Sequence, residues 1–257
     1  MTYQRGAGLY HPEPEAISFE DCHFYHTMEI PGHGLVRGDW DLRGGVDHYL
    51  GGLEFSGKRV LEIGPASGFL TFEMERRGAE VVCVELEDEP GWDFVPYPPA
   101  VMDHVYAGRR ETMRRLKNSF WFAHRAHRSR AKVHYGDVYN LPAALGRFDI
   151  AMMTSVLLHC RDPLRVVQQC AARSDALVVT DMYCPALEGS AECRLVPTAE
   201  NRQWDTWWHF STKLFHQFFV VLGFAAAPPT VHRFWHLEAA AYDFFTIVGR
   251  RLPEAGA

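Results

Sequence analysis

A glycine-rich turn and a later acidic residue could together hold a nucleoside. The apolar run Val60–Ile63 meets the turn Gly64–Gly68, and a second apolar run, Val81–Val84, ends in Glu85. In a strand–turn–helix–strand unit of this kind, glycines let the backbone approach the ligand and the carboxylate accepts hydrogen bonds from both ribose hydroxyls. The turn lacks the G-x-G-x-x-G spacing that cradles a pyrophosphate, and Glu62 in front of it would repel phosphate. We therefore expect a nucleoside that carries positive charge.

These residues resemble the first motif of the class I S-adenosylmethionine (SAM) methyltransferases, and the likeness continues in the right order along the chain. Gly136–Val138 is similar to the family's adenine-contacting motif, Phe148–His159 to its fourth strand and the helix after it, and Ala176–Asp181 to its fifth strand. Ala66 stands where many members carry glycine, which narrows the turn without abolishing it. The resemblance covers roughly residues 57–183.

The resemblance implies an α/β, Rossmann-like fold with a seven-stranded, mostly parallel sheet, helices on both faces, and SAM as the cofactor. Glu85 would bind the ribose, and Asp137 would bind the exocyclic amine of adenine or act as a helix N-cap. Glu62 would face the ammonium group of SAM or order the loop that does, and a structural salt bridge is an equal alternative. The residues expected around SAM are Tyr25, Glu62, Gly64, Ala66, Gly68, Glu85, Leu86, Asp137, Val138 and Thr154.

Three histidines are candidates for a catalytic base. Methyl transfer from a sulfonium is an in-line displacement, so the protein mainly aligns the acceptor and, for a hydroxyl acceptor, supplies a base. Histidine suits that role because its pKa lies near neutral pH. Of the fourteen histidines, we expect His26, His159 and His209 near the mouth of the site. A V-L-x-H stretch like the one that ends in His159 recurs in family members of different chemistry, which favours a structural role there.

No metal site is expected. The metal-dependent subclass that methylates catechols has an acid at the end of the fourth strand and an Asp-Asn pair after the fifth, whereas this chain has Met152–Ser155 and Asp181–Met182. His232 and His236 have the spacing of a metal-binding pair on a helix. They fall in an expected strand or turn with no third ligand nearby, so a structural histidine pair is favoured.

The elements that must position these residues alternate between strands and helices, which predicts a parallel sheet covered on both faces. The expected strands are Arg59–Ile63, Glu80–Glu85, Lys132–Tyr135, Phe148–Thr154 and Ala176–Asp181, followed by a hairpin in the apolar runs Ala225–Arg233 and Phe244–Arg250. The expected helices are Phe69–Arg77, about 103–128, Pro163–Ala171 with Asp162 as N-cap, and Ser211–Leu222.

Three segments lie outside this repeat. Residues 1–55 are rich in aromatic side chains and histidine, and we expect them to form a lid over the SAM pocket of a methyltransferase domain at 56–257. Inserts at about 88–131 and 183–210 would emerge at the carboxyl ends of the strands, where ligands bind in open α/β sheets. The aromatic block Trp204–Phe210 is either the wall of an acceptor pocket or a packing plug.

A basic stripe is the other unusual feature. Residues 109–132 contain nine lysines and arginines and a single acid, Glu111, in a protein whose net charge is −6. A solvated helix face is the default interpretation. The alternative is a site for an anionic substrate, which could be phosphorylated, carboxylated or a nucleic acid.

The composition is that of a globular enzyme. The chain has 257 residues, of which 47% are hydrophobic and 23% charged, and can bury a substantial core. Its apolar runs fall short of the roughly 18 residues of a membrane span, and the first residues lack the pattern of a signal peptide. Six cysteines without a C-x-x-C pair indicate reduced thiols. We therefore expect a cytoplasmic protein without a membrane partner.

The function expected from the sequence is SAM-dependent methylation of a small-molecule acceptor, such as a natural-product or sugar intermediate, at oxygen. Trp40–Asp41 and Val156–Pro163 resemble the tRNA wobble-uridine modifying enzymes that use a carboxylated SAM, which is the alternative enzyme class. Against it, the N-terminal section is shorter than in those enzymes and the net charge is acidic. A non-catalytic SAM-binding subunit is a further alternative, which the intact Gly64, Gly68 and Glu85 disfavour.

Overall fold

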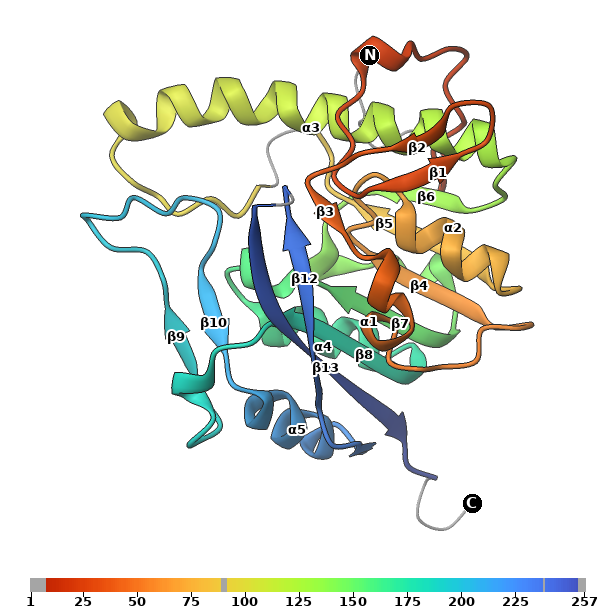
Figure 1. Ribbon diagram of the computed structural model, residues 1–257. Coiled ribbons are helices and arrows are strands. Elements are labelled where there is room, and N and C mark those ends of the chain that lie inside the picture. The colour runs from red at the N-terminus through yellow and green to blue at the C-terminus, as the bar shows by residue number, and fades with distance from the viewer. Residues whose placement is uncertain (1–7, 89–91, 238, 254–257) are drawn as a thin grey trace.

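One large mixed sheet organises the protein (Figure 1) in a computed structural model that describes residues 8–88, 92–237 and 239–253. Its central strands lie in the order β6-β5-β4-β7-β8-β13-β12. Neighbours from β6 to β8 are parallel, and β13 is antiparallel to both β8 and β12. These seven strands form the mostly parallel sheet that the sequence predicts. They are β4 (Arg59–Ile63), β5 (Glu80–Glu85), β6 (Lys132–Tyr135), β7 (Phe148–Thr154), β8 (Ser174–Met182), β12 (Thr230–His236) and β13 (Ala240–Arg251).

Two short strands that the sequence does not predict enlarge the sheet to nine strands. β3 (Trp40–Asp41) pairs with β12, and β11 (Phe224–Ala226) pairs with β13. The apolar run Ala225–Arg233 is therefore not one hairpin strand as expected, because Pro228 and Pro229 interrupt it and proline cannot donate to a strand ladder. Two small hairpins lie outside the sheet: β1 (Met28–Ile30) with β2 (Gly34–Val36), and β9 (Cys193–Leu195) with β10 (Trp208–Phe210).

Helices cover both faces of the sheet because successive strand residues point to opposite sides. On one face, residues such as Val60 pack in a cluster with α2 (Phe69–Arg76) and α3 (Pro99–His127). On the other face, residues such as Leu61 pack with α4 (Pro163–Ala171) and α5 (Thr212–Val221). The short α1 (Val46–Tyr49) joins the first cluster through Tyr49. The described residues also form the 3₁₀ turns η1 (Phe19–Asp21), η2 (Arg43–Gly45), η3 (Val138–Asn140), η4 (Ala143–Leu145), η5 (Leu157–His159) and η6 (Pro185–Leu187).

Local sequence signals set most helix ends. The Asp162 side chain accepts a hydrogen bond from the Arg165 amide, with Pro163 in the first turn, so α4 begins where expected. α3 begins at Pro99, a few residues earlier than expected, since proline fits the first helical position. The helix expected immediately after the fourth strand is wrong: the chain forms only the 3₁₀ turn η5 before α4.

The N-terminal section packs into the main core. Met28, Ile30 and Leu42 belong to the same buried cluster as Val60 of β4. The section also lies along α3, where the His23 amide donates to the Ser119 hydroxyl at 2.8 Å.

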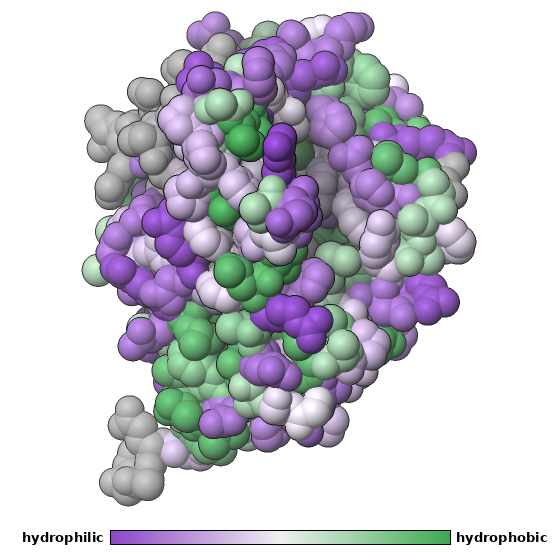
Figure 2. Space-filling model, turned by 90° about the vertical axis from the view of Figure 1, so that its left-hand side faces the viewer, coloured by the Kyte–Doolittle hydropathy of each residue, from purple (hydrophilic) through white to green (hydrophobic). Residues whose placement is uncertain are grey.

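The surface is polar over most of the face in Figure 2, and hydrophobic side chains gather toward its lower end, where α5 lies in Figure 1. Among the large apolar residues of α5, Val220 and Val221 are the most exposed, at 53% and 71%. In the described ranges, no helix combines the length and the apolar character that crossing a bilayer requires. All six cysteines lie in those ranges as free thiols.

Candidate active site

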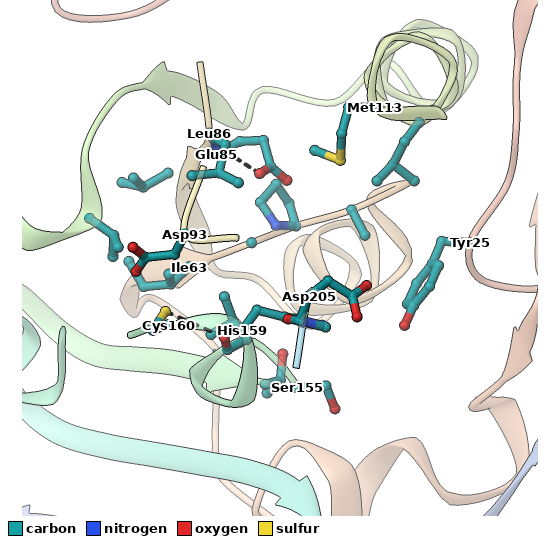
Figure 3. Close-up of a pocket in the computed structure, with 18 of the residues that line it drawn as sticks. Tyr25, Ile63, Glu85, Leu86, Asp93, Met113, Ser155, His159, Cys160 and Asp205 are labelled. Atoms are coloured by element: carbon teal, nitrogen blue, oxygen red, sulfur yellow. Dashed lines mark hydrogen bonds between the residues drawn. The ribbon is translucent and has the colours of Figure 1, made fainter. Parts of the chain in front are cut away.

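A cavity of about 270 Å³ lies at the carboxyl ends of β4, β5, β6 and β7 (Figure 3). The β4–α2 turn, α3, the N-terminal section and the segment around Asp205 contribute to its lining as well. Ten of the residues expected at the site line this one cavity: Tyr25, His26, Gly64, Ala66, Glu85, Leu86, Asp137, Val138, Thr154 and His159. Three expected residues, Glu62, Gly68 and His209, are not part of its lining.

The β4–α2 turn brings the backbone close to the cavity. Gly64 has φ +70°, and a Cβ there would lie 3.2 Å from the Val156 side chain. Ala66 also has a positive φ, 51°, so it keeps a turn geometry that glycine adopts more readily. At Gly68, with φ +89°, a Cβ would lie 2.6 Å from the Phe72 ring. Gly68 thus allows the start of α2 to pack and does not face the cavity.

Glu85 and Asp137 present carboxylates to the cavity from neighbouring strand ends. One oxygen of Glu85 accepts the Leu86 amide at 2.7 Å. Burial raises the pKa of Glu85, and the Lys117 ammonium opposes that rise. Asp137 caps η3 by accepting the Tyr139 amide at 2.8 Å, so its N-cap role is realised while the carboxylate still borders the cavity. A carboxylate has about four acceptor positions, so both groups retain capacity for ribose hydroxyls or an amine.

Glu62 lies beneath the turn instead of in the cavity. Its side chain is 1% exposed and accepts hydrogen bonds from the Thr71 hydroxyl at 2.5 Å and from the Cys83 thiol at 3.5 Å. These contacts join β4, α2 and β5. Burial raises the pKa of Glu62 to about 7. Within the described residues it has no ion-pair partner, so the salt-bridge alternative is not what the structure shows.

His159 is held in a single tautomer at the edge of the cavity. Its Nδ1 lies 2.5 Å from the backbone oxygen of Asp205. A carbonyl oxygen can only accept, so Nδ1 carries the hydrogen and the neutral ring keeps a lone pair on Nε2. Burial lowers the pKa of His159, which keeps the ring neutral near pH 7.

The other two candidate histidines differ in position. His26 is 7% exposed and its Nδ1 has no hydrogen-bond partner among the described residues. Burial lowers its pKa to about 3. His209 lies on β10 opposite Arg194, outside the cavity, which corrects the expectation that it lies near the mouth. Its position next to two tryptophans in the sequence was misleading, because that block packs against other loops.

The aromatic block acts as a packing plug. The Trp207 indole donates to the Asp93 carbonyl at 2.5 Å, and the Trp208 indole donates to the Arg161 carbonyl at 3.2 Å. Trp204 makes an edge-to-face contact with Phe94 at 5.1 Å. Only Asp205 of this block is among the cavity residues.

Sequence reasoning missed several cavity residues that come from distant segments. Tyr49 and Ser155 share a hydrogen bond of 2.6 Å between their hydroxyls. His23 Nε2 lies at hydrogen-bond distance, 2.9 Å, from a carboxylate oxygen of Asp39. Arg109 also lines the cavity, and the basic stripe was the signal that could have pointed to it. Most of these contacts join residues far apart in the chain, so no local pattern reveals them.

Several side chains of the basic stripe form ion pairs within the protein. Arg114 pairs with Glu111 at 2.6 Å, and Lys117 pairs with Asp88 at 2.7 Å. Arg125 pairs with Glu13 at 2.7 Å. In the described ranges no group of three or more potential metal ligands occurs. His232 instead stacks on His48, with ring centres 4.2 Å apart.

Solved structures with the same fold include several methyltransferases. The N-terminal domain of EvdMO1, solved with SAH and D-fucose, has a TM-score of 0.56 and 20% identity, over 91% of this chain and 93% of that chain. Magnesium protoporphyrin IX methyltransferase from Synechocystis PCC 6803, with bound SAH, has a TM-score of 0.53 and 13% identity, over 82% of each chain. A protein described as an RNA methyltransferase, from Pyrococcus horikoshii, has a TM-score of 0.50 and 16% identity, over 81% of each chain.

Sequence comparison establishes the family. No curated protein matches the chain. A family model described as a methyltransferase domain matches residues 42–223, which is more than half of the chain and includes every strand from β4 to β8. Together with the strand order and the cavity at the strand ends, this match shows that the chain belongs to the class I SAM-dependent methyltransferases.

Proposed function

We propose that this enzyme transfers the methyl group of SAM to a hydroxyl group of a small-molecule acceptor, with His159 as the general base. The observation that carries the proposal is the 2.5 Å contact between His159 Nδ1 and the Asp205 carbonyl, which leaves Nε2 as a proton acceptor. When bound, SAM supplies an activated methyl group on a sulfonium. The chain must therefore supply orientation, exclusion of water and a base.

The cofactor half of the cavity fits SAM. Glu85 would accept hydrogen bonds from both ribose hydroxyls, and Asp137 and Val138 would contact the adenine, as the family resemblance implies. Gly64 and Ala66 hold the turn in a conformation that brings backbone atoms to the cavity edge. Buried Glu62 joins β4 to α2, the two elements that flank this turn, which supports the interpretation that it orders the loop.

The N-terminal section would close the acceptor side. We propose that residues 1–55 act as a lid, because Tyr25, His26, Asp39 and Tyr49 all line the cavity. Such closure excludes water and aligns the acceptor with the donor. Tyr49 and Ser155, joined by their hydroxyl–hydroxyl contact, could orient an acceptor hydroxyl near His159.

A sugar-like acceptor is consistent with the polar lining. Asp39, Asp93 and Asp205 add carboxylates to the cavity beyond those assigned to SAM. Carboxylates accept hydrogen bonds from neighbouring hydroxyls, which suits a polyhydroxylated molecule. The structural neighbour solved with D-fucose and SAH supports this class of acceptor. The tRNA alternative gains no support, because much of the stripe that would contact phosphates is ion-paired.

The test is the variant His159→Asn, assayed by SAH release with a panel of hydroxylated sugars and phenols. Loss of a general base should lower kcat by about 10²–10⁴-fold, while SAH affinity stays unchanged. The wild-type rate should have an acid limb below pH 6.5, rising with pH as His159 loses its proton, because burial lowers the pKa of its ring. His216→Asn, an exposed position on α5, is the matched control. Full activity of His159→Asn would refute the assignment.

A further inference from the structure

Arg109 differs from the rest of the basic stripe. It is the only lysine or arginine among the described residues that line the cavity. Its guanidinium carbon lies 5.7 Å from the centre of the Trp204 ring. Within the described ranges its nitrogens have no hydrogen-bond or ion-pair partner, in contrast to Arg114, Lys117 and Arg125.

Three acids of the cavity have hydrogen-bond donors other than Arg109. Asp39 pairs with His23 at 2.9 Å. Asp93 accepts the Arg161 amide at 2.8 Å and also the Tyr139 hydroxyl. Asp205 accepts the Gln203 amide group at 2.8 Å. Among the described residues none of these carboxylates forms a hydrogen bond or ion pair with Arg109, so its N–H groups remain available to a ligand.

The remaining acid near Arg109 is Glu85, which is assigned to the ribose. Arg109 contributes to lowering the pKa of Glu85, but Lys117 contributes more. Arg109 lies on the inner face of α3 with Thr112 and Met113, which also line the cavity. This face of α3 looks across the cavity toward Asp205 and His159 (Figure 3).

We propose that the acceptor carries an oxyanion, a carboxylate or a phosphate, that pairs with Arg109 while its hydroxyl group lies at His159. A guanidinium binds both kinds of oxyanion through two parallel N–H bonds, and such charge-assisted pairs are stronger and more directional than neutral ones. The contact with Trp204 restricts the guanidinium plane and so favours one orientation of the ligand. This inference rests on the proposed small-molecule acceptor, and it makes Arg109 a specificity-determining residue.

The test uses matched probes on the SAH-saturated protein, measured by calorimetric titration. Benzoate and phenyl phosphate carry the two oxyanions, and benzamide is the neutral planar control. We expect at least one anion to bind about tenfold or more tightly than benzamide, as a charge-assisted pair implies. Arg109→Gln should abolish this preference, and Arg109→Lys should retain part of it. Arg110→Gln, at the exposed neighbouring position, should retain all of it.

Several results would overturn the inference. These are equal or undetectable binding of all three probes to the wild type, or an anion preference that survives Arg109→Gln. A tenfold loss of SAH affinity in Arg109→Gln would place the guanidinium on the cofactor and would also overturn it. His159→Asn should keep the anion preference while losing turnover. Failure of the oxyanion site is thereby distinguishable from failure of the base assignment.

Discussion

Replacing Glu62 by glutamine should stabilise the protein above neutral pH and much less in acid. Burial raises the pKa of Glu62 to about 7 from an ordinary 4.5. As pH rises from 4.5 to 7, the unfolded chain loses this proton before the folded protein does, so the folded state loses stability. Above about pH 7 the loss in the free energy of unfolding is complete and amounts to about 3 kcal/mol, at 1.36 kcal/mol per pKa unit. Glutamine stays neutral and still accepts from Thr71, so it avoids this cost.

The measurement is urea unfolding of the wild type and Glu62→Gln at pH 5 and pH 8.5. We expect a gain of about 3 kcal/mol at pH 8.5 and under about 1 kcal/mol at pH 5. In a protein of this size, 3 kcal/mol raises Tm by about 6–12 °C. Glu200→Gln, at an exposed position, should change neither curve. An equal gain at both pH values, or none at pH 8.5, would refute the reasoning.

The remaining predictions concern the cofactor, nucleic acid and the lid. Glu85→Ala should lower SAH affinity at least tenfold in a folded protein, because a hydrogen bond to a charged group contributes about 1.5–3 kcal/mol; wild-type affinity in a calorimetric titration would remove its ribose role. Bulk tRNA should not bind at physiological salt, and tight binding that falls steeply with salt would favour the RNA-modifying alternative. SAH should protect the segment around Tyr25 and Trp40 from proteolysis, and equal cleavage with and without SAH would contradict a lid.

The parallel centre of the sheet was predictable because its signals are local. β4 and β5 match the expected Arg59–Ile63 and Glu80–Glu85, since both are apolar runs of strands buried on two faces. The glycine turn and the acidic residue that ends β5 lie in the same short stretch of chain. The cofactor half of the cavity could therefore be predicted as a unit.

The edges of the sheet were not predictable from local signals. β3 has only two residues, and it forms because β12 offers it a free edge at Trp235 and His236. β11 is likewise defined by its pairing with β13, a strand that comes later in the chain. Strands this short have no periodicity of their own, so their existence depends on the assembled sheet.

The acceptor half of the cavity depends on contacts between distant segments, which a local sequence pattern does not reveal. His159 obtains its tautomer from the carbonyl of Asp205, 46 residues later, whereas the local V-L-x-H stretch favoured a structural role. His209 had a more suggestive local setting, but β10 places it outside the cavity. Arg109 shows that distant contacts also distinguish residues within one helix. Lys117 and Arg125 form ion pairs with Asp88 and Glu13, which other segments supply, whereas Arg109 forms no ion pair within the part of the chain that the structure describes. The difference in role that we propose between Arg109 and the other basic side chains of α3 therefore arises from what the rest of the fold brings to each of them.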